Sequence, residues 1–460
     1  MFVNKPIIVS ATGEGDYTTI GEAIKNAQPD SCILVRPGLY QEGLIIDKQL
    51  EIIGDGLVAD IVIESTDSNC IIMQADYAVV RGLTLRGSGA VKDKEFFAVD
   101  IPQGKLVLKD CDITSDSLSC IGIHGATANP LIRRCIIHDG KHSGVFVHEN
   151  GQGTLEDCDI FANADSGVKI TEGGNPIIRR CQIHDGKQVG VLVYKNGQGT
   201  VEDCDIFANA NVGVGIKQGG NPIIRRCQIH DGKSAGVWVS EKGQGTVENC
   251  DIFANANVGV QIREGGNPII RRCQIHNAKS FGIYVYKNGE ARVEDCDIFA
   301  NADSGVEIKQ GGNPIIRRCQ IHDGKSHGVV VKENGQGIIE DCDIFANALS
   351  GVEIKLGSNP IIRRCQIHDG KTSGVYVDEN GEGTVENCDI FANANAGVAI
   401  REGSNPIIRR CQINRNGYKA VWVFKKGAGR VENCNLTDNA RGSWDIKPGC
   451  SVYPSGNIED

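Results

Sequence analysis

Cysteine and histidine are the residues of this chain whose chemistry needs explaining first. The 19 cysteines could form disulfides, bind a metal or react with an oxidant. Fourteen of them recur every 23 residues, from Cys135 to Cys434, and six histidines recur every 46 residues, from His138 to His368. A reactive site needs one set of groups rather than a ladder of them. We therefore interpret both series as structural repeats.

The histidine series has the wrong spacing for a metal. Phenylalanines such as Phe161 and Phe207 take the same place in the intervening coils, so successive histidines lie two coils apart. Strand spacing puts them about 9–10 Å from each other, whereas a zinc–nitrogen bond is about 2 Å long. We predict a stacked ladder of His and Phe, and we expect neither a metal nor another cofactor. No ligand set is predicted among the four remaining histidines, which are His124, His142, His148 and His327.

Two coils of 23 residues alternate within each 46-residue unit. One reads NPIIRRCQIHDGKxxGVxV, as in 221–239, and the other reads GxGTVEDCDIFANAxxGVxI, as in 197–216. Apolar residues alternate in runs of three or four positions between Gly, Asn and Asp, which is typical of short strands and turns. The sequence therefore predicts an all-β fold, a parallel β-helix solenoid. Ile, Val and Cys fill its inward positions, so the cysteines are expected to be core residues with free thiols.

Charged residues also alternate from coil to coil. Glu156, Arg179 and Glu202 begin a series that continues unbroken to Glu432. Opposite charges on stacked strands stabilise a sheet modestly, and like charges destabilise it. A slip by one coil would stack like on like, so we interpret this series as fixing the register rather than binding a substrate.

The two ends depart from the repeat. In 16–28, apolar residues fall on one helical face and Thr19 with Glu22 has the spacing of a capping box, which predicts a short cap helix. After Cys434 the repeat decays; Trp444 is expected to close the last coil, and the tail to be loose. We divide the chain into an N-terminal strand and cap helix (1–31), irregular coils (32–129), regular repeats (130–440), and a C-terminal cap and tail (441–460).

Composition narrows the function classes. The net charge of −10 argues against a nucleic-acid-binding role, which needs a basic field. No signal peptide and no apolar run long enough to span a membrane is visible, and many free thiols favour a cytoplasmic location. Common catalytic motifs are missing, and a catalytic set in the irregular section 57–130 stays open. Its polar candidates are Asp93, Glu95, Asp100, Lys105 and Asp110.

An aromatic stripe is the strongest functional candidate. In the strand GVxVx the two valines point inward, so the x positions face outward, and every second coil carries a large side chain there. Rows of aromatic side chains on a surface are typical of binding sites for proteins or sugars; packing between neighbouring coils is the alternative. The predicted binding residues are Phe146, Leu192, Tyr194, Trp238, Tyr284, Tyr286, Tyr376, Trp422 and Phe424.

Two resemblances can now be given. The repeat GNPIIRRCQIHDGKQVGVLVYKNGQGTVEDCDIFANANVGVGI resembles the β-helix repeats of F-box-only ubiquitin-ligase subunits and their bacterial relatives, within the carbohydrate-binding and sugar-hydrolase (CASH) group of right-handed, pectin-lyase-like β-helices. In the eukaryotic relatives the β-helix presents substrate proteins, and the resemblance implies a similar surface here. The chain has no F-box segment and no terminal zinc finger, so a ligase role does not carry over.

The N-terminal segment is similar to the opening of pectin methylesterases. The likeness lies in DYTTIGEAI, LVRPGLYQEGLIIDK and LEIIGDG, between Gly15 and Gly56. It implies a right-handed β-helix with an N-terminal cap. The later Gln/Asp/Asp/Arg motifs of that family are missing, which argues against its activity.

These observations lead to a functional hypothesis with two alternatives. We expect a non-catalytic scaffold that binds a protein partner along the aromatic stripe. The first alternative is a carbohydrate-binding or polysaccharide-processing protein, related to lyases, hydrolases or epimerases. A purely structural rod is the second.

Overall fold

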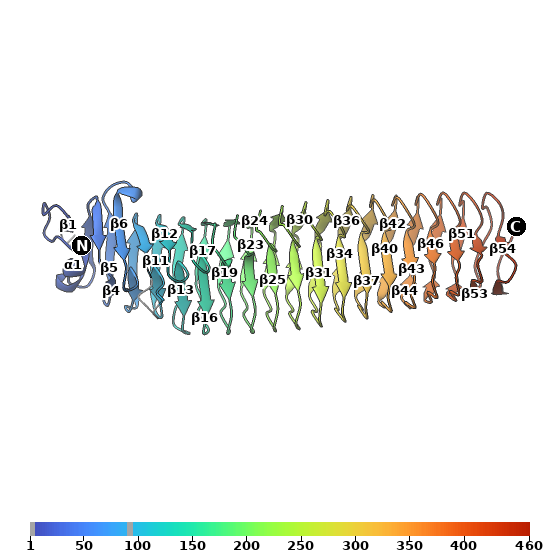
Figure 1. Cartoon of the computed structure of the whole chain (residues 1–460), viewed down its shortest axis with the longest axis horizontal. Helices are drawn as coiled ribbons and strands as arrows, with labels where there is room; N and C mark the ends of the chain where they lie inside the picture. Colours follow the sequence, from blue (N-terminus) through green and yellow to red (C-terminus); the bar gives the residue numbers. More distant parts are fainter. Residues whose placement is uncertain (1–4, 90–94) are drawn as a thin grey trace. The chain divides into compact units, whose positions relative to one another are not determined.

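The computed structural model describes residues 5–89 and 95–460, and the chain divides into two compact units, 1–229 (unit 1) and 230–460 (unit 2). Within each unit, coils of about 23 residues stack on one another (Figure 1). Each coil gives one short strand to each of three parallel sheets, named A, B and C. The predicted right-handed parallel β-helix is therefore confirmed.

Unit 1 contains these strands. Sheet A consists of β1 (Ile7–Val9), β2 (Ser31–Val35), β5 (Leu50–Gly54), β8 (Tyr77–Arg81), β11 (Lys105–Lys109), β14 (Leu131–Arg133), β17 (Thr154–Glu156), β20 (Ile177–Arg179), β23 (Thr200–Glu202) and β26 (Ile223–Arg225). Sheet B consists of β3 (Gly38–Gln41), β6 (Ile61–Ser65), β9 (Thr84–Gly87), β12 (Asp112–Ser115), β15 (Ile136–His138), β18 (Asp159–Phe161), β21 (Gln182–His184) and β24 (Asp205–Phe207); β27 (Gln228–His230) contains the unit boundary. Sheet C consists of β4 (Leu44–Ile46), β7 (Ile71–Met73), β10 (Val99–Ile101), β13 (Ile121–His124), β16 (Val145–His148), β19 (Ser166–Ile170), β22 (Val189–Val193) and β25 (Val214–Ile216).

Unit 2 repeats the arrangement. Its sheet A consists of β29 (Thr246–Glu248), β32 (Ile269–Arg271), β35 (Arg292–Glu294), β38 (Ile315–Arg317), β41 (Ile338–Glu340), β44 (Ile361–Arg363), β47 (Thr384–Glu386), β50 (Ile407–Arg409), β53 (Ala428–Glu432) and β55 (Ser451–Ser455). Its sheet B consists of β30 (Asp251–Phe253), β33 (Gln274–His276), β36 (Asp297–Phe299), β39 (Gln320–His322), β42 (Asp343–Phe345), β45 (Gln366–His368), β48 (Asp389–Phe391) and β51 (Gln412–Asn414). Its sheet C consists of β28 (Val237–Val239), β31 (Val260–Arg263), β34 (Ile283–Tyr286), β37 (Val306–Lys309), β40 (Val329–Lys332), β43 (Val352–Ile354), β46 (Val375–Val377), β49 (Val398–Ile400), β52 (Val421–Val423) and β54 (Trp444–Ile446).

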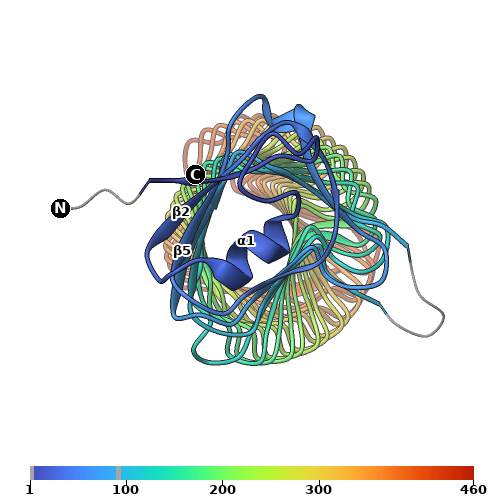
Figure 2. The same ribbon diagram turned by 90° about the vertical axis from the view of Figure 1, so that its left-hand side faces the viewer.

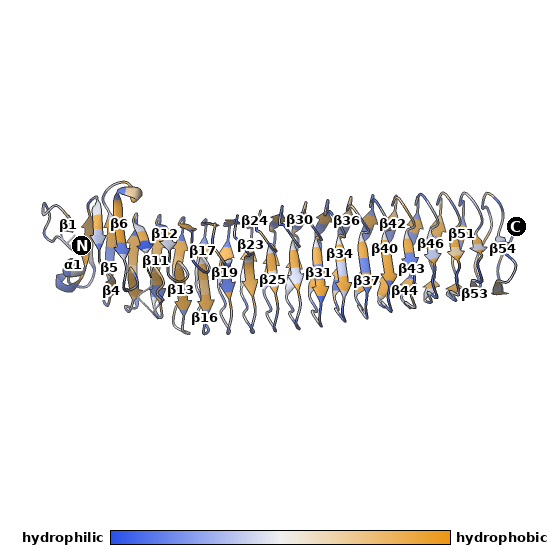
Figure 3. Ribbon diagram, in the orientation of Figure 1, coloured by the Kyte–Doolittle hydropathy of each residue, from blue (hydrophilic) through white to orange (hydrophobic). Residues whose placement is uncertain are grey.

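Strand periodicity creates the core. In β28, Val237 and Val239 are fully buried and Trp238 lies outside. Hydrophobic colour accordingly concentrates on the strands, and hydrophilic colour on the turns (Figure 3). The glycine of the GV pair allows close stacking: a Cβ on Gly259 would come within 2.5 Å of Ile275 Cγ2.

The repeated cysteines and histidines are structural, as predicted. Every cysteine from Cys135 to Cys434 in the 23-residue series is a free, buried thiol. The ring of His184 stacks on that of Phe207 with 4.6 Å between centroids. Its Nε2 lies 2.9 Å from Asp159 Oδ1 and its Nδ1 lies 2.7 Å from Asp185 Oδ2, so both nitrogens already have a partner.

Buried asparagines hold the turn between sheets B and C. Asn347 Oδ1 accepts a hydrogen bond from Gly324 N at 3.1 Å, and its Nδ2 donates to Ile321 O and Phe345 O. The side-chain amide thereby satisfies backbone groups that the tight turn leaves unpaired in the core. This arrangement recurs in every second coil, for example at Asn393.

A short helix closes the N-terminal coils of unit 1. Helix α1 (Ile20–Asn26) lies across their opening (Figure 2), and it buries Ile20, Ala23 and Ile24. Thr19 Oγ1 accepts from Glu22 N, as the capping box predicts, and Glu42 accepts from Ile20 N and Gly21 N at 2.7 and 2.8 Å. A 3₁₀ turn, η1, spans Val58–Asp60. None of the helices in the described residues is long and apolar enough to cross a membrane.

The C-terminal segment continues the solenoid. Strand β54 pairs with β52, and β55 pairs with β53 in parallel register. The expectation of a loose tail is therefore wrong, because these segments complete the backbone hydrogen bonds of the last coils. Trp444 pairs with Val421 at an inward position and half-buries its ring at the end of the core.

Candidate functional site

The nine residues of the predicted aromatic stripe lie on the outer face of sheet C. Val375 and Val377, on either side of Tyr376, are fully buried, so the predicted register is correct. Eight of the nine side chains are half-buried, and Tyr286 is nearly covered, with 9% of its surface exposed. Their role in binding stays a prediction. Unit 1 carries Phe146, Leu192 and Tyr194, and unit 2 carries Trp238, Tyr284, Tyr286, Tyr376, Trp422 and Phe424.

Cationic side chains from the next coil cover several of these rings. The guanidinium carbon of Arg263 lies 5.3 Å from the ring centre of Trp238, and that of Arg401 lies 5.5 Å from the ring centre of Tyr376. Such packing is attractive because the ring face is negative. It explains why the stripe is half-buried. Much of the stripe is therefore cross-strand packing, the alternative that the sequence left open.

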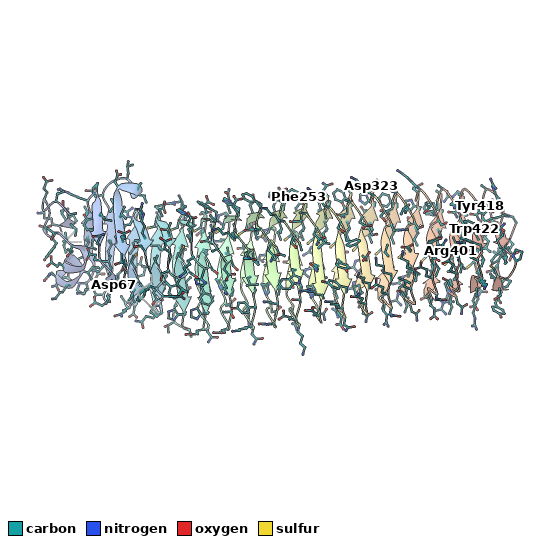
Figure 4. The ribbon with its side chains drawn as sticks, viewed as in Figure 1. Asp67, Phe253, Asp323, Arg401, Tyr418 and Trp422 are labelled. Atoms are coloured by element: carbon teal, nitrogen blue, oxygen red, sulfur yellow. The ribbon has the colours of Figure 1, made fainter. Side chains whose placement is uncertain are left out.

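One stretch of the stripe opens into a cleft of about 460 Å³ on unit 2. The cleft crosses five neighbouring coils on the outer face of sheet C, where Trp422 and Phe424 stack with 4.0 Å between ring centroids. Figure 4 labels Arg401, Tyr418 and Trp422 at this place. The cleft is lined by His327, Leu349, Ser350, Glu353, Thr372, Ser373, Tyr376, Asn395, Arg401, Trp422 and Phe424.

A carboxylate and an imidazole meet inside the cleft. Glu353 is 7% exposed, and its Oε2 lies 3.0 Å from Lys355 Nζ and 3.7 Å from His327 Nε2. Burial lowers the pKa of His327 below its ordinary value, so the ring is neutral at neutral pH. Its Nδ1 accepts a hydrogen bond from Ser350 N at 3.2 Å, which leaves the proton on Nε2, facing Glu353.

The arginine of the cleft is already paired. Arg401 donates to both carboxylate oxygens of Asp378, at 2.7 and 2.6 Å, and Asp378 is only 4% exposed. The pair holds Arg401 over the ring of Tyr376. Burial raises the pKa of Tyr376 to about 12, so its hydroxyl keeps its proton and can donate. The cleft thus combines aromatic faces with fixed hydrogen-bonding groups and little uncompensated charge.

A second cluster lies on sheet C of unit 1. Asp100 Oδ1 lies 2.9 Å from His124 Nε2, and the rings of His124 and His148 stack with 5.0 Å between centroids. The ring of Phe146 also stacks with that of His148, with 4.3 Å between centroids. The hydrogen bond with Asp100 raises the pKa of His124, whereas burial lowers that of His148.

The sequence analysis missed this cluster. His148 also lies with two carboxylates, Glu149 and Glu172, whose ligand atoms are all within 4.8 Å of one another. The sequence analysis did not foresee that His148 lies beside these two carboxylates. His124 and His148 are 24 residues apart rather than 23, because one coil is a residue longer, and β13 and β16 pair them directly.

The other polar candidates of the irregular section do not come together in one site. Asp110 pairs with Arg134, whose Nε lies 2.7 Å from its Oδ1. Glu95 lies near Lys141 and His142, at 3.7 and 3.8 Å. No partner side chain of Lys105 is found among the described residues, and Asp93 lies outside them. Of the candidates within the described residues, Asp100 is the one that joins the cluster of His124 and His148.

The chain is similar to a known protein family and to several known proteins. A family model described as the right handed beta helix region matches residues 69–221, 212–314 and 304–458. A pectinesterase of Daucus carota is 26% identical over 178 residues, which are 35% of this chain and 53% of that protein. A pectinesterase/pectinesterase inhibitor U1 of Solanum lycopersicum is 22% identical over 176 residues, which are 35% of this chain and 29% of that protein.

The N-terminal fragment of bacteriophage Phi29 gene product 12 superposes with a TM-score of 0.48 at 12% identity, over 95% of this chain and 90% of that one. The chain spans about half or less of the length of the two curated relatives.

Proposed function

The chain belongs to the family of the right handed beta helix region, and from that premise we propose that it binds a polysaccharide in the cleft of unit 2. The curated relatives are pectinesterases, named for a polysaccharide substrate. They favour the carbohydrate alternative over the protein-binding scaffold that the sequence analysis placed first, and nothing in the comparisons supports that scaffold.

The residues that line the cleft are the main support for this proposal. A pyranose ring has an apolar C–H face and a rim of hydroxyls, so it needs an aromatic surface beside hydrogen-bonding groups that are held in place. Trp422 and Phe424 supply the surface at one end of the cleft, and Glu353 supplies a buried acceptor at the other. Thr372 and Asn395 line the space between them.

Charge favours a neutral glycan over a polyuronate. Asp378 neutralises Arg401, and Lys355 with Glu353 forms a second pair, so the described residues around the cleft leave no lysine or arginine unpaired for a sugar carboxylate. The whole chain carries a net charge of −10, which repels polyanions. We therefore expect neutral polysaccharides to bind more tightly than polygalacturonate or alginate.

Affinity electrophoresis tests this proposal. Wild-type protein is run through gels that hold neutral or acidic polysaccharides, beside Trp422→Ala and the control Tyr453→Ala, since Tyr453 is 65% exposed outside the cleft. We expect at least one neutral polysaccharide to retard wild type and the control, and Trp422→Ala to migrate freely. A cleared zone behind the band would add cleavage to binding. Unretarded migration of wild type in every gel would contradict the proposal.

A further inference from the structure

The turn that follows sheet C brings an imidazole and two carboxylates together in unit 1. His148 ends β16, Glu149 follows it, and Glu172 occupies the same place one coil later. Ligand atoms of these three residues all lie within 4.8 Å of one another. Both glutamates are exposed, so their side chains are free to close around an ion without disturbing the core.

The ring of His148 is held in place for such a role. It stacks with the rings of Phe146 and His124, with 4.3 and 5.0 Å between centroids, and Asp100 fixes His124 through a 2.9 Å hydrogen bond. An imidazole whose orientation is fixed by its neighbours is well placed to bind a metal.

The repeat contains two equivalent turns that serve as internal comparisons. In the turn 92 residues later, Ser240 takes the place of His148 beside Glu241 and Glu264. That turn keeps the two carboxylates and lacks the imidazole.

The third turn, 230 residues after the first, has Asp378, Glu379 and Glu402, whose oxygens also lie within 4.8 Å of one another. There Arg401 occupies both oxygens of Asp378, and Lys425 Nζ lies 3.2 Å from Glu402 Oε1. Cations of the protein therefore already neutralise this acidic group. In the first turn no arginine pairs with the three ligand residues among the described residues; Lys195 Nζ lies 3.4 Å from Glu172 Oε1, and His124 Nδ1 lies 3.9 Å from Glu149 Oε2.

We propose that His148, Glu149 and Glu172 bind a divalent first-row transition metal of the Zn²⁺ class, with water completing the coordination. One imidazole with two carboxylates is a ligand set that such ions accept, whereas Mg²⁺ and Ca²⁺ prefer oxygen ligands alone. This site lies on unit 1 and does not depend on the glycan cleft of unit 2, so either proposal can fail without the other.

Cobalt titration tests the site, because Co²⁺ replaces Zn²⁺ and absorbs visible light when protein ligands bind it. We expect the full chain to give a saturable visible spectrum that Zn²⁺ abolishes by competition and an excess of Mg²⁺ does not. His148→Gln and Glu172→Gln should each weaken Co²⁺ binding at least tenfold, and the matched control Glu241→Gln should bind as wild type does.

Two results would overturn the proposal. One is a His148→Gln variant, folded by circular dichroism, that binds Co²⁺ as tightly as wild type. The other is the absence of a Co²⁺ spectrum in wild type, or a spectrum dominated by the near-ultraviolet charge-transfer band of a thiolate ligand, which would place the ion on cysteine instead.

Discussion

Arg363 and Glu340 lie 23 residues apart in the sequence and face each other on neighbouring strands of sheet A, with Arg363 Nη2 2.6 Å from Glu340 Oε2. Arg363 Nε also donates to the same oxygen at 2.7 Å. Each coil pair of unit 2 repeats this relationship, as Glu386 and Arg409 show at 2.6 Å. The ion pair thus joins the two coils of each such pair in register.

Reversing one charge of this series should destabilise unit 2. Arg363→Glu would place a second carboxylate beside Glu340, which is 9% exposed, and we expect it to lower the free energy of unfolding by about 1–3 kcal/mol. Urea unfolding followed by circular dichroism measures the effect. Lys371→Glu, at an exposed turn position, is the control and should change the free energy of unfolding little. Equal midpoints for the two variants would show that the series does not stabilise the fold.

The ion pair beneath the cleft should behave as a unit. Arg401→Ala leaves the nearly buried Asp378 carboxylate unpaired, and breaking such a pair costs about 3–5 kcal/mol. The double variant Arg401→Met with Asp378→Asn removes both charges and should recover most of that loss. Thermal unfolding of the three proteins compares them; a double variant as unstable as Arg401→Ala would contradict the pairing argument.

Two histidines should give opposite pH dependence. Burial lowers the pKa of His327 below 6.5 in the folded protein, so on acidification the unfolded chain protonates this histidine at a higher pH than the folded protein does. The free energy of unfolding therefore falls as the pH drops through about 6.5. The hydrogen bond with Asp100 raises the pKa of His124, so this residue adds stability at low pH that is lost as the pH rises through its folded value.

Substitutions should separate these two contributions. Between about pH 7.5 and about pH 5.5, His327→Gln should lose less stability than wild type on acidification, and His124→Gln should lose more. Urea midpoints at both pH values supply the comparison. If both variants shift the pH dependence in the same direction, one of the two assignments is incorrect.

The thiols should be largely protected in the native protein. Of the 19 cysteines, all except Cys32 and Cys450 are buried, and burial raises the pKa of Cys70 to about 12. A thiol reagent at neutral pH should label at most these two quickly, and all 19 after denaturation. Rapid labelling of further thiols in the native protein would show that the cysteine series is not closed core.

Regular features of the sequence predicted most of the fold. The 23-residue period fixed the coils, the alternation in GVxV separated Val375 from Tyr376, and Thr19 with Glu22 located the cap helix. Each of these is a local pattern that repeats or follows a known capping rule. The structure agrees with them because neighbouring coils impose the same environment at every repeat.

The candidate sites depend on departures from the repeat, which a fixed period hides. A count of 23 places His124 opposite Val147, and only the longer coil brings it against His148. The stripe also gave no sign of which rings are covered, because that depends on where Arg263 and Arg401 point. The cleft needs side chains from five coils at once, and no single motif records such a set.

Fluorescence of Trp422 during glycan titration tests the central claim most directly. The chain has three tryptophans, so Trp238→Phe with Trp444→Phe leaves Trp422 as the only reporter. With the neutral polysaccharide that retards the protein in gels, or oligosaccharides from it, we predict a saturable change in emission that Glu353→Gln weakens. The contradicting result would be a protein with Trp422 as its only tryptophan that the polysaccharide retards in gels without any change in Trp422 emission. The glycan would then bind elsewhere.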